Sequence, residues 1–168
     1  MKGQFYMHFD TMPKGTHQQR GVYVRNGKPH FYEKAIVKEA RNEFMRELLP
    51  NRPKAPAQGP IMLKVTFYFD VKNRSLWGKL KTTKPDTDNY LKLLKDCMTE
   101  AGFWTDDALV VDEHVKKYYA EKATISVYWE EVTGDEENDS RRIYGFLGGH
   151  AGGHGPGHSP GGNIRRDR

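Results

Sequence analysis

The stretch of residues 61–71 constrains the fold of this chain more than any other part of the sequence. Large apolar side chains recur there at every second position: Ile61, Leu63, Val65, Phe67 and Phe69. A period of two places these side chains on one face of an extended strand. Because a strand with one apolar face has to bury that face against other elements, we expect residues 61–71 to belong to a β-sheet covered by helices.

Two other segments have the periodicity of amphipathic helices. Residues 33–49 repeat apolar side chains at a spacing of four and end before Pro50, which cannot continue a helix. A second helix is expected from about Asp86 or Asp88 to Ala101, with Gly102 as its C-terminal stop. The residues expected in the core from these segments and their surroundings are Ala40, Phe44, Leu48, Leu91, Leu94, Cys97, Met98, Phe103 and Trp104.

The remaining regular segments are typical of β-strands. Residues 22–32 predict a hairpin centred on an Asn-Gly pair, which tolerates the positive φ of a tight turn. Residues 4–10 alternate moderately, and residues 109–119 and 123–132 are expected to pair with each other as a second hairpin. This order of elements predicts an α+β fold, in which a small mixed or antiparallel sheet carries two main helices packed on one face.

The composition changes after residue 132. Residues 148–162 consist almost entirely of Gly, His, Pro, Ala and Ser, which cannot bury enough apolar surface to offset their ordering entropy. We therefore predict one folded domain, residues 1–132, followed by a flexible Gly/His-rich C-terminal tail, residues 133–168.

The net charge is also uneven along the chain. The formal charge is +5, and because residues 133–168 hold five acids and five arginines, all of the excess lies in residues 1–132. A basic folded part favours nucleic acid or an anionic membrane surface as partner. No apolar run is long enough to span a bilayer, and the single Cys97 fits a reducing compartment without disulfides. We expect a cytoplasmic protein without a membrane partner.

Four aspartates stand at two places in this basic part of the chain. Asp86 and Asp88 flank the expected start of the second helix, and Asp106 and Asp107 follow its end. Carboxylate oxygens are ligands that Mg²⁺ prefers, and a positive surface gathers the phosphates on which such an ion acts. A helix of about 15 residues spans roughly 22 Å, so the chain must fold back before the two pairs can meet. The alternative role for Asp86 or Asp88 is helix capping.

Lys92 lies four residues after Asp88, on the same face of the expected helix, and Lys95 follows nearly one turn later. An Asp–Lys pair at this spacing is an ordinary contact on a helix surface, worth roughly 0.2–0.5 kcal/mol. The same lysine beside a metal site would bind the scissile phosphate or protonate the leaving oxygen. Spacing leaves both interpretations open.

The two acidic segments carry a family resemblance. The first reads KPDTDNxxK and begins at Lys84, and the second reads GFWxDDAxVVD and begins at Gly102. Together they resemble the signature of RusA-type Holliday junction resolvases, a family of homodimeric, Mg²⁺-dependent endonucleases of bacteria and their prophages. The resemblance is close over residues 61–130 and weak over residues 1–60.

The resemblance implies roles for individual residues. The essential residues of the family fall on Asp86, Asp88, Asp107 and Lys92. The three acids would bind Mg²⁺, with Mn²⁺ as a candidate substitute, and all four residues would take part in catalysis. The resemblance favours Asp107 over Asp106, which spacing alone does not separate. It also implies a homodimer that acts on branched DNA, the four-way junction.

A basic loop leads directly into the first acidic segment. Residues 72–84 contain five Lys or Arg and no acid, so the loop would hold phosphates beside the metal site. Trp77 in this loop could stack on bases at a branch point or serve as a packing anchor. Lys14, His17 and Arg20 form a second candidate phosphate-binding patch. The expected DNA-binding residues are Lys72, Arg74, Trp77, Lys79, Lys81, Lys84 and Lys95.

These observations predict a structure-selective endodeoxyribonuclease that resolves Holliday junctions by Mg²⁺-dependent hydrolysis in DNA recombination and repair. One alternative is a non-catalytic protein that binds branched DNA and whose acids only cap a helix. Another is a different metal-dependent enzyme, such as a flap nuclease. A nucleotidyltransferase usually needs a Gly-Ser pair ahead of its Asp-x-Asp, and this chain has none there.

Overall fold

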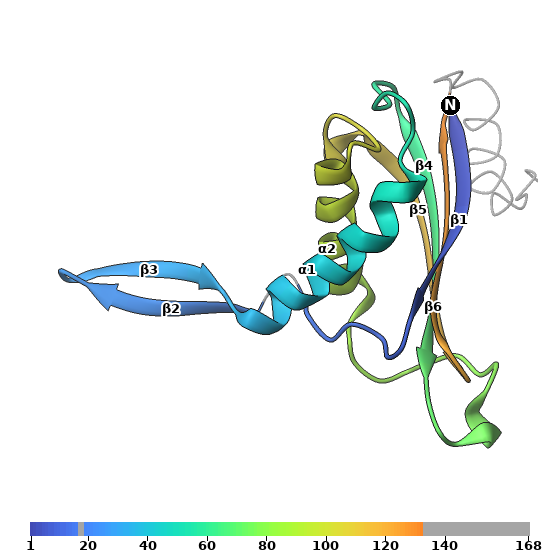
Figure 1. Ribbon diagram of the computed structural model, residues 1–168, viewed down its shortest axis with the longest axis horizontal. Helices are drawn as coiled ribbons and strands as arrows, with labels where there is room; N and C mark the ends of the chain where they lie inside the picture. Colours follow the sequence, from blue (N-terminus) through green and yellow to red (C-terminus); the bar gives the residue numbers. More distant parts are fainter. Residues whose placement is uncertain (17–18, 133–168) are drawn as a thin grey trace, which may run out of the picture. The chain divides into compact units, whose positions relative to one another are not determined.

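The computed structural model describes residues 1–16 and 19–132, so the predicted flexible tail lies outside the described residues. The described part is an α+β fold, as predicted, with a mixed four-stranded sheet, a separate two-stranded sheet and two α-helices (Figure 1). None of its helices combines the length and apolar character needed to cross a membrane. In chain order the elements are β1 (Lys2–Phe9), β2 (Arg20–Arg25), β3 (Lys28–Glu33), α1 (Ala35–Leu48), η1 (Leu49–Asn51), β4 (Ile61–Asp70), η2 (Arg74–Leu76), α2 (Thr87–Ala101), η3 (Asp107–Leu109), β5 (Val110–Ala120) and β6 (Ala123–Glu131).

β4 occupies a central position in the larger sheet. The strand order is β1-β6-β4-β5, in which β4 runs parallel to β5 and antiparallel to β6, while β1 pairs antiparallel with β6. The predicted apolar face of β4 is buried along its whole length, from Ile61 to Phe69. Both α1 and α2 cover one face of this sheet, which confirms the expected packing of the helices (Figure 1).

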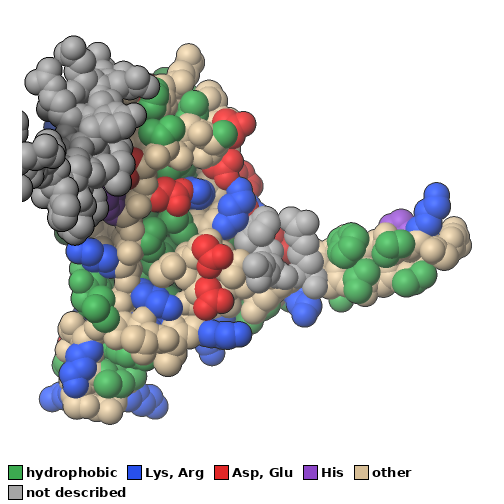
Figure 2. Space-filling model, turned by 180° about the vertical axis from the view of Figure 1, so that it is seen from behind, with side chains coloured by type: hydrophobic (Ala, Val, Ile, Leu, Met, Phe, Trp, Pro, Cys, Tyr) green, Lys and Arg blue, Asp and Glu red, His purple; other side chains and the backbone are tan. Residues whose placement is uncertain are grey.

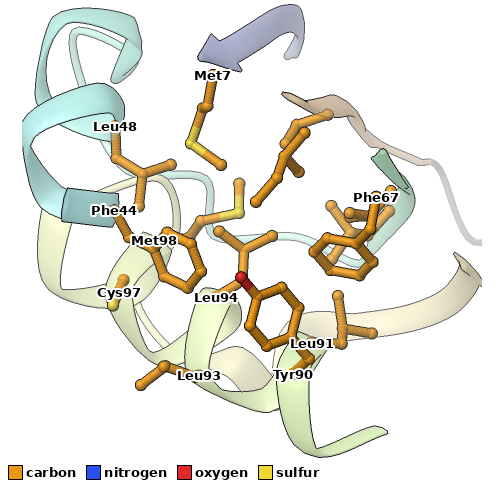
Figure 3. Close-up of a cluster of buried hydrophobic side chains, with 14 of the residues drawn as sticks. Met7, Phe44, Leu48, Phe67, Tyr90, Leu91, Leu93, Leu94, Cys97 and Met98 are labelled. Atoms are coloured by element: carbon orange, nitrogen blue, oxygen red, sulfur yellow. The ribbon is translucent and has the colours of Figure 1, made fainter. Parts of the chain in front are cut away.

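The predicted helix faces form the core against the sheet. Leu94 and Met98 of α2 are fully buried in one cluster with Phe44 of α1 and Phe67 of β4 (Figure 3). The ring of Tyr90 meets Phe44 and Phe67 edge-on, with centroids 5.8 and 5.0 Å away. Because Tyr90 is in the first turn of α2, this packing fixes the end of the helix that carries the first acidic segment. Three more residues are buried as predicted, namely Cys97, Phe103 and Trp104.

The prediction that residues 109–119 and 123–132 pair as a hairpin is wrong. β5 and β6 lie on opposite sides of β4, and the two strands do not pair with each other. The physical reason lies in the side chains of β5, where Asp112, Glu113 and His114 are exposed. Charged residues suit an edge strand, because they discourage further strand pairing. β4 and β6 bury alternate positions and therefore take the two inner places.

The predicted Asn-Gly hairpin is confirmed as β2 and β3. Asn26 and Gly27 have φ values of 52° and 70°, the left-handed conformations that such a tight turn requires. Val22 pairs with Phe31 and shares its face with Val24. Val22 is 58% exposed, and Phe31 and Val24 are each 71% exposed. Figure 2 shows hydrophobic side chains along the hairpin. The hairpin therefore presents an apolar face that nothing in the described residues covers.

The two ends of α2 also confirm the predicted limits. Asp86 is the N-cap residue in an extended conformation, with φ −70° and ψ 141°. Gly102 ends the helix with φ 84°, and its backbone N–H donates to the carbonyls of Met98 and Thr99. A left-handed residue at this position favours glycine, which has no Cβ to clash. The helix ends therefore set where the two acidic segments enter and leave the core.

Candidate active site

The first acidic segment forms the N-terminal end of α2. Asp86 is the N-cap residue, yet its side chain makes no capping hydrogen bond, and Asp88 lies in the first turn. Both side chains are exposed, and neither has an ion-pair or hydrogen-bond partner among the described residues. The helix dipole and free amide groups favour ionised carboxylates at this end. Asp86 therefore does not cap α2 through its side chain, the alternative role that its position suggested.

The second acidic segment folds back against α2. Asp106 is the N-cap of η3, where its Oδ1 accepts a hydrogen bond from the backbone N–H of Ala108 at 2.8 Å. The next residue, Asp107, instead accepts a hydrogen bond through Oδ2 from the ammonium of Lys92. Lys92 also pairs with Oδ1 of Asp96 at 2.9 Å. The two neighbouring aspartates thus differ in position: Asp106 shapes the turn, and Asp107 reaches the face of α2 that carries Lys92.

The contact between Lys92 and Asp107 keeps both partners charged. The hydrogen bond from Lys92 lowers the pKa of Asp107 below its ordinary value. The hydrogen bonds to Asp107 and Asp96 raise the pKa of Lys92. Because the side chains of Lys92 and Asp107 are 42 and 29% exposed, solvent screens their attraction and the pair adds little to stability. Its consequence is positional, since it fixes a cation and a carboxylate beside the second turn of α2.

The carboxylates predicted to bind Mg²⁺ are linked through Lys92 but do not form a closed cluster. Asp88 lies one helical turn before Lys92, which contacts Asp107, so a single turn of α2 links two of the three predicted ligands. Within residues 1–16 and 19–132, no three His, Cys, Asp or Glu side chains are gathered closely enough to hold a metal ion. The oxygen-only donor set fits Mg²⁺, which is usually bound through one or two carboxylates together with substrate phosphates and water.

The basic loop is laid along the edge of the sheet. The backbone N–H of Gly78 donates to the carbonyl of Tyr119, and that of Lys81 donates to the carbonyl of Lys117, both at 2.9 Å. An antiparallel bridge between Leu80 and Tyr118 continues this pairing. The side chains of Lys and Arg gather around the loop in Figure 2. Four of the predicted DNA-binding residues are exposed: Lys72, Arg74, Lys79 and Lys84.

Some of the predicted DNA-binding residues have partners inside the protein. Trp77 donates its indole N–H to the carbonyl of Val71 at 2.9 Å, and its ring lies 5.4 Å from the guanidinium of Arg74. This is the geometry of a packing anchor that holds the basic loop against the end of β4. Lys95 donates to Oε1 of Glu113 on β5. The exposed basic residues of the loop are therefore better placed for phosphates than Trp77 or Lys95.

Lys117 is a supporting residue that the sequence analysis missed. From β5 its ammonium donates to the carbonyl oxygens of Thr83 and Pro85, both at 2.8 Å. These carbonyls come just before Asp86, so Lys117 fixes the segment that delivers the first predicted metal ligand. Its partners are backbone atoms, which leave no motif in the sequence. A lysine within a predicted strand was the only available signal, and such a lysine is ordinary.

A pocket of about 860 Å³ opens beside Asp86. Its walls come from the β1–β2 connection, the ends of β4 and β5, the basic loop and the first turn of α2. Lys14, from the second predicted phosphate-binding patch, lines it together with Lys81 and Lys84 of the basic loop. His17 and the side chain of Arg20 lie outside the described part of the chain. Two basic segments that the sequence kept separate therefore meet at one cavity.

Comparison with known proteins identifies relatives over most of the chain. The model of the family described as "Endodeoxyribonuclease RusA" matches residues 10–128. The crossover junction endodeoxyribonuclease rusA of Lactococcus phage r1t is 35% identical over 135 residues, which cover 79% of this chain and 100% of the phage protein. The uncharacterized protein YqaN of Bacillus subtilis (strain 168) is 32% identical over 121 residues, which cover 66% of this chain and 84% of that protein.

Proposed function

The chain belongs to the RusA family of endodeoxyribonucleases, and on that premise we propose that it resolves four-way DNA junctions by hydrolysing phosphodiester bonds. The family resemblance predicted from the two acidic motifs is confirmed. The match also extends beyond residues 61–130, because the family model begins at residue 10 and so includes the hairpin β2–β3 and α1. Most of the body that supports the site, and not only the motifs, therefore matches the family of nucleases.

The observation that carries this proposal is the contact between Lys92 and Asp107. It joins two acidic segments that the length of α2 would otherwise hold apart. The residues to which the resemblance assigns chemistry are thereby drawn toward one corner of the protein. The raised pKa of Lys92 keeps its ammonium protonated at neutral pH. From this position Lys92 stabilises negative charge on the scissile phosphate or on the leaving oxygen.

Magnesium belongs to the proposal. Asp86, Asp88 and Asp107 are the residues that would hold Mg²⁺, with Mn²⁺ as a candidate substitute. The bound ion would supply Lewis-acid polarisation of the scissile phosphate. The role of the protein's own residues is to bring the scissile phosphate to the metal site and to orient it. Lys84 lines the same pocket as Asp86, and Lys79 is exposed in the same loop; both attract the DNA backbone independently of its sequence.

A homodimer is the second part of the proposal. A four-way junction has two-fold symmetry, and its resolution requires two symmetric cuts. A C₂ pair of chains with one site in each subunit matches that symmetry. Because the proposed substrate is DNA, we expect the protein to act in the cytoplasm.

Cleavage of a synthetic four-way junction tests the proposed function. The chain is incubated with Mg²⁺ and the junction, and in parallel with flap and linear duplex DNA of the same sequences. We expect paired, symmetric nicks in the junction that disappear with EDTA. Faster cleavage of the flap would assign the chain to another class of nuclease. Tight junction binding without any cut would indicate a non-catalytic binding protein, and either result would overturn the proposal.

A further inference from the structure

The pocket beside Asp86 has a lining of mixed chemical character. Three ammonium groups surround it, from Lys14, Lys81 and Lys84. Met12 and Phe69 give it an apolar wall, and Asn89 adds a side-chain amide. A nucleotide has the complementary parts, namely an anionic phosphate, a flat apolar base and a polar base edge. The volume of about 860 Å³ lies in the range of about 300–1,000 Å³ typical of pockets for molecules of this kind, and it is far larger than one phosphate needs.

Contacts between distant parts of the chain hold the walls of this pocket in place. The backbone N–H of Met12 donates to Oδ1 of Asp70 at 2.9 Å, which ties the β1–β2 connection to the end of β4. The hydroxyl of Tyr90 donates to the carbonyl of Pro13 at 2.6 Å, which ties the same connection to α2. Each contact involves a different element. The pocket is therefore part of the fold and is formed before any ligand enters.

Lys81 is itself fixed within this pocket. Its ammonium lies 5.2 Å from the ring centroid of Phe69 and 5.0 Å from that of Tyr119. The same ammonium donates to the hydroxyl of Thr83, which lies 3.1 Å from the hydroxyl of Tyr119. A cation held over two aromatic rings loses little mobility when an anion binds to it. Lys14 and Lys84, which are exposed, add two further charges at the mouth.

We propose that this pocket binds one unstacked nucleotide of the cleaved strand, adjacent to the scissile phosphate. Lys14 and Lys84 hold the phosphate of that nucleotide, and its base enters against the wall of Met12 and Phe69. The assignment rests on the proposed function, because Asp86 lines the same pocket and would place the scissile phosphate at its edge.

The pocket would make the enzyme selective for branched DNA. Moving a base out of a continuous duplex costs free energy, and the cost is smallest where the base is already unpaired or poorly stacked. Nucleotides at a branch point meet that condition, whereas those in a linear duplex do not. Capture of a nucleotide therefore directs the cut to the branch point and lets the pocket lining discriminate among bases there.

Fluorescence of 2-aminopurine tests whether a base leaves the stack. Four-way junctions carrying this base at single positions around the cut are bound to full-length Asp88→Asn chain in Mg²⁺, so that the strand stays intact. We expect the fluorescence to rise at one position next to the cut, and not in a linear duplex. No rise at any position near the cut would overturn the assignment. Free deoxynucleoside 5′-monophosphates should leave the signal unchanged; loss of the signal on their addition would assign the pocket to mononucleotides instead.

Lys14→Met removes one phosphate contact and is compared with Lys54→Met, an exposed lysine that does not line the pocket. We expect Lys14→Met to raise the KM for junction cleavage about tenfold, as suits the loss of one charge-assisted hydrogen bond, with little change in kcat. Equal KM values for the two variants would overturn the assignment. If the unaltered chain leaves four-way junctions uncut, the proposed function fails; if it cuts them without the fluorescence rise, only the pocket assignment fails.

Discussion

The acid corner, by which we mean Asp86, Asp88, Lys92 and Asp107, and the hairpin β2–β3 are both exposed but are held in opposite ways. Contacts from other elements brace the acid corner: Lys117 of β5 holds the carbonyls before Asp86, and Asp107 of η3 holds Lys92. The two strands of the hairpin pair only with each other within the described residues.

The comparison indicates where a single side chain has the largest effect. In the acid corner each brace links residues that are distant in sequence, such as Lys92 with Asp107 or Lys117 with Pro85. Removing one brace shifts a group to which the proposed function assigns chemistry. In the hairpin the register depends on a local turn and a regular ladder, so single changes on its exposed face disturb little beyond themselves.

The largest effect is expected on junction cleavage, from a substitution in the acid corner. Asp88→Asn keeps the shape of the side chain but removes the charge that a metal ligand needs. We expect kcat for junction cleavage to fall by more than about 100-fold, the upper end for residues that only support a metal ligand. Junction binding should be retained, because attraction of the phosphates depends on the lysines. Gel-shift and cleavage assays measure the two quantities.

The matched control for that variant is Asp10→Asn, which removes the same charge from an exposed position. It should leave kcat within about twofold of the unaltered chain, because screened surface charges interact weakly. A similar loss of cleavage in both variants, or a parallel loss of binding and cleavage in Asp88→Asn, would contradict a metal-ligand role for Asp88.

The next effect concerns the brace behind Asp86. Lys117→Met removes the donor to the carbonyls of Thr83 and Pro85 while keeping most of the aliphatic stem. We expect the Mg²⁺ concentration for half-maximal cleavage to rise about 10–100-fold, with much of the activity restored by saturating Mg²⁺. Titration of cleavage with Mg²⁺ measures the shift. Lys116→Met, at the exposed neighbouring position, should leave the titration unchanged; an equal shift in both variants would count against the brace.

The same contrast explains what could be predicted from the sequence. The Asn-Gly turn, the alternation of β4 and the limits of α2 are signals within a few residues, and the structure confirms each of them. The two acidic motifs can likewise be identified from the sequence, because each is a short contiguous segment. Family membership followed from these segments, before any contact between them was known.

The features that escaped prediction depend on contacts between distant segments. The prediction pairs β5 with β6 because the two strands are consecutive in the sequence. In the structure β4 lies between them, and the charged residues of β5 are those of an edge strand. The role of Lys117 could not be predicted because it donates to backbone carbonyls, which every residue has and which no sequence motif marks. Lys14 and Lys84 line one pocket only because the β1–β2 connection packs against α2.

A smaller effect on stability separates two tyrosines, one in the first turn of α2 beside the acid corner and one in the hairpin. Tyr90→Phe removes a buried hydrogen bond to the carbonyl of Pro13 and leaves that oxygen without its donor, at a cost of about 1–3 kcal/mol in the free energy of unfolding. Burial raises the pKa of Tyr90, so its phenol stays protonated and keeps donating into mildly alkaline solution. Tyr23→Phe in β2 should change stability by less than about 0.5 kcal/mol, because the ring of Tyr23 still stacks on His30. Urea unfolding compares the variants, and equal midpoints would contradict the bracing of α2 by Tyr90.

The smallest effect is expected at Cys97, on the buried side of α2. Burial raises the pKa of the Cys97 thiol to about 12, so at pH 8 only about one thiol in 10⁴ is ionised. Because the thiolate is the reactive form, iodoacetamide should leave folded Cys97 unmodified for hours. A thiol placed in the hairpin by Val24→Cys, at a position that is 71% exposed, should react at the rate of a free cysteine in the same molecule. Mass spectrometry of the peptides distinguishes the two sites. Comparable modification of both would mean that α2 opens as readily as the hairpin. The contrast between a braced corner and a hairpin whose strands, within the described part of the chain, pair only with each other would then be lost.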